Sequence, residues 1–139
     1  MRSAYRPGTR AWLLLPAAVL VASGLATGCS STPAYCTAAS NLKTSVSNLG
    51  NVDVAKNGLS SLQTALSSVV SDAKTFASDA KSAFAPQTTA LSNSVSSLGT
   101  AITSAKSQPS VSAVSAVISA VTQVKTSASN LQNAVSGKC

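Results

Sequence analysis

The sequence predicts an all-α fold, and more narrowly an antiparallel four-helix bundle closed by a disulfide between the ends of the helical region. Apolar residues recur three and four positions apart along four stretches of the chain, which is the spacing of one helix face. Turn-forming residues separate these stretches at residues 50–51, at Pro86 and at residues 107–109. Cys36 stands near the start of the helical region and Cys139 at its end. A bond between them requires both ends to meet, as they do in an even number of antiparallel helices.

The first helix is expected over residues 34–48 and the second over residues 54–83. A Gly-Asn pair at residues 50–51 is a stop signal for the first helix. Asp53 is expected to cap the second. The predicted core positions of the two helices are Tyr35, Ala38, Leu42, Val46, Leu49, Leu59, Leu62, Leu66, Val69, Ala73, Phe76, Ala80 and Phe84.

Pro86 is predicted to start the third helix, over residues 86–106, and the fourth is expected over residues 110–136. One long kinked helix through Pro86 is the alternative, because the apolar spacing continues across it. The disulfide favours a break, since three helices would leave the chain ends far apart. Lys125 is expected at the margin of the fourth helix, with its stem packed and its ammonium in water. The predicted core positions are Leu91, Val95, Leu98 and Ile102, then Val114, Val117, Ile118, Val121, Val124, Ala128, Leu131 and Val135.

The N-terminal segment has the features of an export signal. Three arginines, Arg2, Arg6 and Arg10, precede an apolar stretch over residues 11–25. That stretch is short for a transmembrane helix. Small residues then lead to Cys29.

The motif Leu25-Ala26-Thr27-Gly28-Cys29 resembles the lipobox of bacterial lipoprotein signals. The resemblance implies that Cys29 receives a diacylglyceryl group, with acyl chains such as palmitate, and becomes the first residue after cleavage. The chain would then comprise a signal peptide (1–28), a lipidated tether (29–33) and a helical bundle domain (34–139) on the extracytoplasmic side of the cell membrane. An ordinary secretory leader cut nearby and an uncleaved anchor are the alternatives. The four residues after Cys29 span roughly 14 Å.

Lipidation of Cys29 would leave two cysteines, Cys36 and Cys139, which removes the odd count. Outside the cytoplasm the two can pair, and closing a loop of about 100 residues contributes roughly 4–5 kcal/mol in the chain-entropy model. Two free thiols are the alternative.

Without the leader, the chain has seven lysines and three aspartates, a net charge of +4, and no Arg, Glu, His, Trp or Met. The missing arginines and the few aromatic residues argue against a nucleic-acid partner. Without histidine and with three scattered aspartates, the sequence suggests neither an acid–base site nor a metal cage. We therefore expect a protein that is not an enzyme and that needs no cofactor or metal.

Lys56, Lys74 and Lys81 fall on one line of an uninterrupted second helix, and Asp72 and Asp79 on another. The lysine line is a candidate stripe for an anionic partner, such as a wall polymer or lipid. The simpler interpretation is a solvated boundary that helps to orient the helices.

The chain resembles the small helical lipoproteins of high-GC actinobacteria, including the mycobacterial ones. The resemblance lies in the lipobox, in the segment Tyr35-Cys36-Thr37-Ala38 followed by Leu42-Lys43-Thr44-Ser45-Val46, and in Ala/Ser/Val-rich amphipathic helices ending near a final cysteine. It implies a cell-envelope location and no assigned activity.

Three functional hypotheses follow. The first is a non-enzymatic scaffold or binding module for another envelope protein, which would use a helix face or the lysine stripe. The second is a carrier that holds an acyl chain or other apolar ligand between its helices. The third is an adhesin-like surface decoration.

Overall fold

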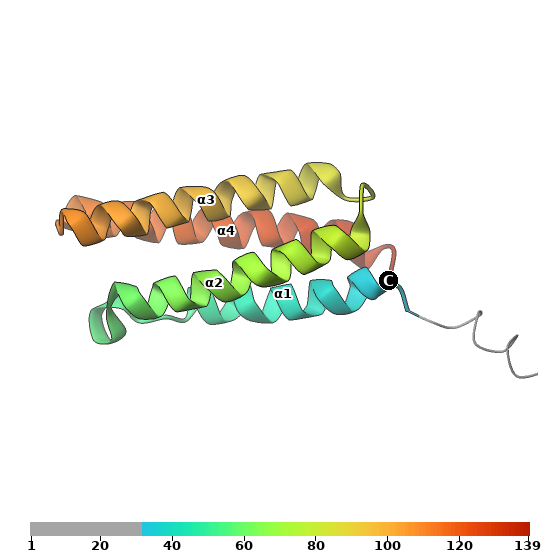
Figure 1. Ribbon diagram of the computed structural model, residues 1–139, viewed down its shortest axis with the longest axis horizontal. Helices are drawn as coiled ribbons and strands as arrows, with labels where there is room; N and C mark the ends of the chain where they lie inside the picture. The colour runs from blue at the N-terminus through green and yellow to red at the C-terminus, as the bar shows by residue number, and fades with distance from the viewer. Residues whose placement is uncertain (1–31) are drawn as a thin grey trace, which may run out of the picture. The chain divides into compact units, whose positions relative to one another are not determined.

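The computed structural model describes residues 32–139, which form four α-helices (Figure 1). They are α1 (Ala34–Gly50), α2 (Val54–Ala80), α3 (Ala85–Ser107) and α4 (Val111–Ser136). Consecutive helices pack side by side, and α1 also packs on α4, so the helices form an up-down-up-down bundle. The predicted all-α four-helix bundle is confirmed. The predicted signal peptide and Cys29 lie outside the described residues, as does most of the tether.

The ends of the helices follow from local side-chain chemistry. The Asp53 carboxylate accepts hydrogen bonds from the backbone N–H groups of Ala55 (3.1 Å) and Lys56 (3.2 Å), which confirms it as the N-cap of α2. The Ser110 hydroxyl caps α4 by accepting from the Ala113 N–H at 3.0 Å. Proline occupies the first turn of α3, where its missing N–H has no helical partner to lose.

The first turn of α2 is separated from the rest of the helix at Gly58, whose φ of 73° and ψ of 175° are not helical. Glycine accepts this positive φ without steric cost. The sequence predicted one uninterrupted helix here, and that part of the prediction is wrong. The apolar stripe of α2 begins after Gly58, so the break leaves the core unchanged.

The connection between α2 and α3 is a tight turn and not a kinked continuous helix, which confirms the break near Pro86. Lys81 has φ 53° and ψ −124°, and among the described residues it is the one non-glycine residue with a positive φ. The Ala83 N–H donates to the Ala80 carbonyl at 3.1 Å across it. These are the features of a type II′ turn with Lys81 at the first central position.

The core is made of apolar side chains from all four helices, and none of the buried side chains in the described bundle is polar or charged. Most predicted core positions are buried, including Leu42, Phe76, Leu98 and Leu131. Phe84 stacks edge-on against Tyr35, with ring centroids 5.3 Å apart. Many surface serines and threonines donate their hydroxyls to the carbonyl four residues earlier, as Thr126 does to Thr122. These bonds keep a hydroxyl-rich surface compatible with helix.

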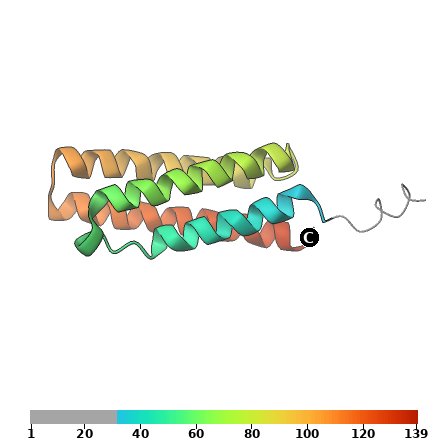
Figure 2. The same cartoon turned by 60° about the horizontal axis from the view of Figure 1, so that its bottom comes forward.

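Cys36 and Cys139 form the predicted disulfide, with their Cα atoms 5.9 Å apart. The bond joins the start of α1 to the chain end that follows α4, so both ends of the described chain lie at the same end of the bundle (Figure 2). No helix among residues 32–139 combines the length and the apolar character that crossing a bilayer requires.

Candidate functional site

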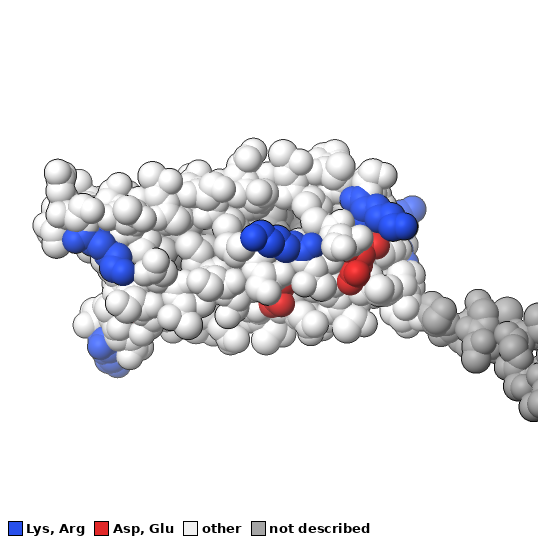
Figure 3. All heavy atoms as spheres, viewed as in Figure 1, with Lys and Arg blue, Asp and Glu red and all other residues white. Residues whose placement is uncertain are grey.

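The three lysines of the predicted stripe do not share one helical line. Lys56 lies before the Gly58 break and pairs with Asp53, Nζ to Oδ2 3.6 Å, while Lys81 lies in the turn after α2. Only Lys74 belongs to the regular part of the helix. Figure 3 shows the basic side chains of one face as separate groups with neutral surface between them. Binding of an anionic partner by these lysines stays a prediction.

A different surface follows the side of α4 that faces α1. We define the α4 seam as seven residues spaced three or four apart along α4, a spacing that places them on one narrow face of the helix. Five of them are exposed to solvent, and Val121 and Gln132 are partly buried. The α4 seam consists of Val111, Val114, Ile118, Val121, Lys125, Ser129 and Gln132.

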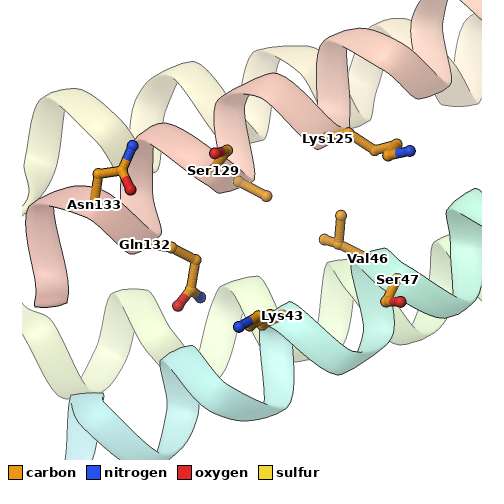
Figure 4. Close-up of a pocket in the computed structure, with 8 residues that line it drawn as sticks. Lys43, Val46, Ser47, Lys125, Ser129, Gln132 and Asn133 are labelled. Atoms are coloured by element: carbon orange, nitrogen blue, oxygen red, sulfur yellow. The ribbon is translucent and has the colours of Figure 1, made fainter.

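The polar half of the α4 seam borders a groove of about 370 Å³ between α4 and α1 (Figure 4). Gln132 crosses the groove and donates from Nε2 to the Ala39 carbonyl at 2.6 Å. Val46 points toward α4 from the opposite side. This groove therefore has an apolar floor and polar walls.

Lys43 from α1 and Lys125 from α4 both line this groove, and their ammonium groups point in opposite directions along it (Figure 4). The Lys125 stem lies over Gly50: a methyl group built at Gly50 would come within 3.2 Å of Lys125 Cδ. The exposed head and packed stem confirm the placement expected for Lys125. Among the described residues, the ion pair found joins Lys56 to Asp53, so neither groove lysine has a carboxylate partner there.

The apolar half of the α4 seam is open to solvent. Val111 is 90% exposed, Ile118 60% and Val114 38%, and these three are the exposed large apolar residues of the described bundle. Ile118 borders two hollows, one of about 480 Å³ over the start of α4 and one of about 210 Å³ toward Gly50 and Lys125. Because Lys125 borders the second hollow and the polar groove alike, the hollows form one continuous surface along α4.

The sequence predicted Val114 and Ile118 as core residues, and the structure shows that this is wrong. Their neighbours Val117 and Val124 are buried, at 1% and 0% exposure. Both residues lie at the edge of the buried face of α4, on the part of the helix that α1, with 17 residues against 26 in α4, does not reach. The stop signal at residues 50–51 implies that the first helix is shorter than the fourth. This is the feature of the sequence that could have revealed the exposure of the two residues.

Residues 32–139 contain no group of three metal-ligating side chains placed to hold an ion. No protein-family model, no curated protein and no solved structure matches the chain.

Proposed function

We propose that the chain is a non-enzymatic lipoprotein of the cell envelope that binds another envelope protein through a helix face, at the extracytoplasmic side of the cytoplasmic membrane. The observation that carries the proposal is the gathering of exposed large apolar side chains on one face of α4. A surface of this kind, bordered by polar residues, is typical of a protein contact.

The predicted anchor and this apolar surface would lie at opposite ends of the bundle. Thr32 and Cys36 are at the disulfide end, and Val111 begins α4 at the other end. Cys29 precedes Thr32 by three residues, a length that spans at most about 11 Å. A lipid on Cys29 would therefore hold the disulfide end close to the membrane and present the start of α4 away from it.

Recognition in this proposal occurs at the surface, because the interior of the described bundle is filled by apolar side chains. The non-enzymatic part of the proposal rests on the composition of the chain, which lacks histidine and glutamate. The carrier alternative would require the helices to separate, since the core side chains occupy the space between them.

Anchoring is tested by fractionating cells that produce the full chain with Cys29→Ala, and the matched control Ser31→Ala. We expect the Cys29 variant to leave the membrane fraction and the control to stay in it. Equal membrane partition of the two would contradict the lipid anchor.

Binding is tested by placing a photo-cross-linking amino acid at one exposed position on each helix: Ser40, Ser71, Ser97 and Ser119. We expect a protein adduct from at least one face, and from α4 above all. Adducts with lipid alone, or none from any helix while the protein stays folded and membrane-bound, would contradict the binding-module proposal.

A further inference from the structure

The disulfide and the Gly50–Lys125 contact fix the register of α1 against α4. Cys36 lies opposite Cys139, and Gly50 lies opposite Lys125, 14 residues further along α1 and 14 residues back along α4. From Lys125 to its first residue Val111, α4 therefore continues without α1 beside it. At 1.5 Å per residue, about 20 Å of α4 has no α1 helix against this side.

The chain after Gly50 fills this space only in part. Val52 and Val54 pack against the core from residues 51–57, and together with Ile118 they border the hollow of about 210 Å³. Figure 2 shows the helical ribbon of α1 ending short of the far end of the bundle, where α4 continues. Along this stretch of α4, a cross-section of the bundle therefore contains three helices instead of four.

Folding alone does not explain the residues that α4 exposes here. Valine and isoleucine lose side-chain freedom in a helix and are poorer helix formers than alanine by a few tenths of a kcal/mol each. Val111 and Ile118 recover little of this cost by burial, because they are 90% and 60% exposed. Their clustering on one face indicates a surface that is covered by something else.

Two lysines at the groove indicate the charge of that partner: Lys125 in the polar half of the α4 seam and Lys43 across the groove on α1. Lys43 and Lys125 have no carboxylate partner among the described residues. With Gly50 opposite Lys125, Lys43 lies opposite Gln132, so the two lysines are two turns apart, about 10 Å along the axis. Since their ammonium groups also diverge, one small anion cannot contact both, whereas two carboxylates seven residues apart on a helix can.

We propose that the α4 seam binds an amphipathic helix of a partner envelope protein, which lies along the groove between α1 and α4 and continues past Gly50 over the uncovered stretch of α4. This inference rests on the proposed function and names its site. The partner helix places apolar residues against Val111, Val114 and Ile118, and acidic residues against Lys125 and Lys43. A second copy of this chain that docked through its own α4 seam would offer these lysines no carboxylate, because none of the seam residues is acidic.

The test uses the full chain in its own cells, with a benzophenone amino acid at Val111, the most exposed of the three apolar residues. The cross-linked peptide is sequenced by mass spectrometry. We expect a peptide with apolar residues three and four apart and two acidic residues seven apart. Lys125→Glu should reduce the adduct at least tenfold, and Lys74→Glu, the control on α2, should leave it unchanged. Circular dichroism of each variant checks that it is folded.

Three results would overturn this inference: an adduct with a second copy of the chain, an adduct whose yield Lys125→Glu does not lower, or no protein adduct from Val111. A membrane as the true occupant is tested with purified Cys29→Ser protein and vesicles containing 30% phosphatidylglycerol; vesicle binding that Ile118→Asp abolishes would also overturn it. Protein adducts from Ser40, Ser71 or Ser97 with none from Val111 would refute this site and leave the proposed function standing.

Discussion

Replacing Lys81 with glycine is expected to stabilise the bundle, although glycine usually destabilises helical proteins. Lys81 has φ 53° and ψ −124° at the first central position of the turn between α2 and α3. An L side chain at these angles crowds the backbone on either side of it, and type II′ turns favour glycine there for that reason. Lys81 is exposed, so its replacement removes no buried contact.

The size of the effect follows from two opposing terms. A non-glycine residue held in a sparsely populated backbone region costs of order 1–3 kcal/mol. Glycine also increases the conformational entropy of the unfolded chain, which offsets about 0.4–1 kcal/mol of the stabilisation gained by relieving the strain. The net gain for Lys81→Gly is therefore about 1 kcal/mol, which raises the melting temperature by about 4 °C for a domain of this length.

Urea and thermal unfolding, followed by circular dichroism on the disulfide-bonded protein, measure this gain. Lys81→Ala is the matched control, because it removes the charge and keeps a Cβ at the positive φ; its stability should change by less than about 0.5 kcal/mol. Ser82→Gly, the next residue in the turn, should gain nothing. The reasoning is refuted if Lys81→Gly is no more stable than the parent, or if Lys81→Ala gains as much.

Three further predictions concern the disulfide, a cap and the core. Replacing Cys36 and Cys139 together by serine removes a link between positions 103 residues apart and should cost about 5 kcal/mol in the free energy of unfolding; a loss below 1 kcal/mol in urea titrations would contradict this. Asp53→Ala should cost about 1 kcal/mol through its two capping bonds, whereas Asp79→Ala, at an exposed position inside α2, should cost almost nothing in the same assay. Ile102→Ala, at a residue 2% exposed, should cost about 3 kcal/mol, and Ile118→Ala below 0.5 kcal/mol; similar losses for the two isoleucines would show that Ile118 is packed.

The number of helices and most of their inner faces could be predicted from the sequence. Apolar spacing reports the helical period directly, and Asp53 and Pro86 are strong local start signals. Two features of α2 were missed for different reasons: the break at Gly58, and the end of the helix at Ala80, three residues before the predicted end. The Gly58 break precedes the apolar stripe and leaves its spacing intact, and lysine at position 81 gives no signal of a positive φ.

The α4 seam could not be predicted from spacing, because spacing does not say whether a neighbouring helix is long enough to cover a residue. Val114 and Ile118 have the same periodicity as the buried Val117 and Val124. What separates them is their place at the edge of the α4 face together with the register of α1, which two contacts determine: the disulfide and the packing of Lys125 on Gly50. Both are long-range contacts, between residues 75 or more positions apart.

The position of the disulfide gives a reason why a partner bound to the uncovered stretch of α4 would also stabilise the bundle. The bundle consists of two helical hairpins, since α1 packs more extensively on α2 than on α4, and α3 more extensively on α4 than on α2. Cys36–Cys139 joins the hairpins covalently at one end. At the other end, beyond Gly50, only the segment of residues 51–57 spans the α1–α4 side. A partner helix seated there would contact Val54 of one hairpin and Ile118 of the other. Its binding energy would therefore hold together the end of the bundle that the disulfide does not reach, so that binding and stability are coupled.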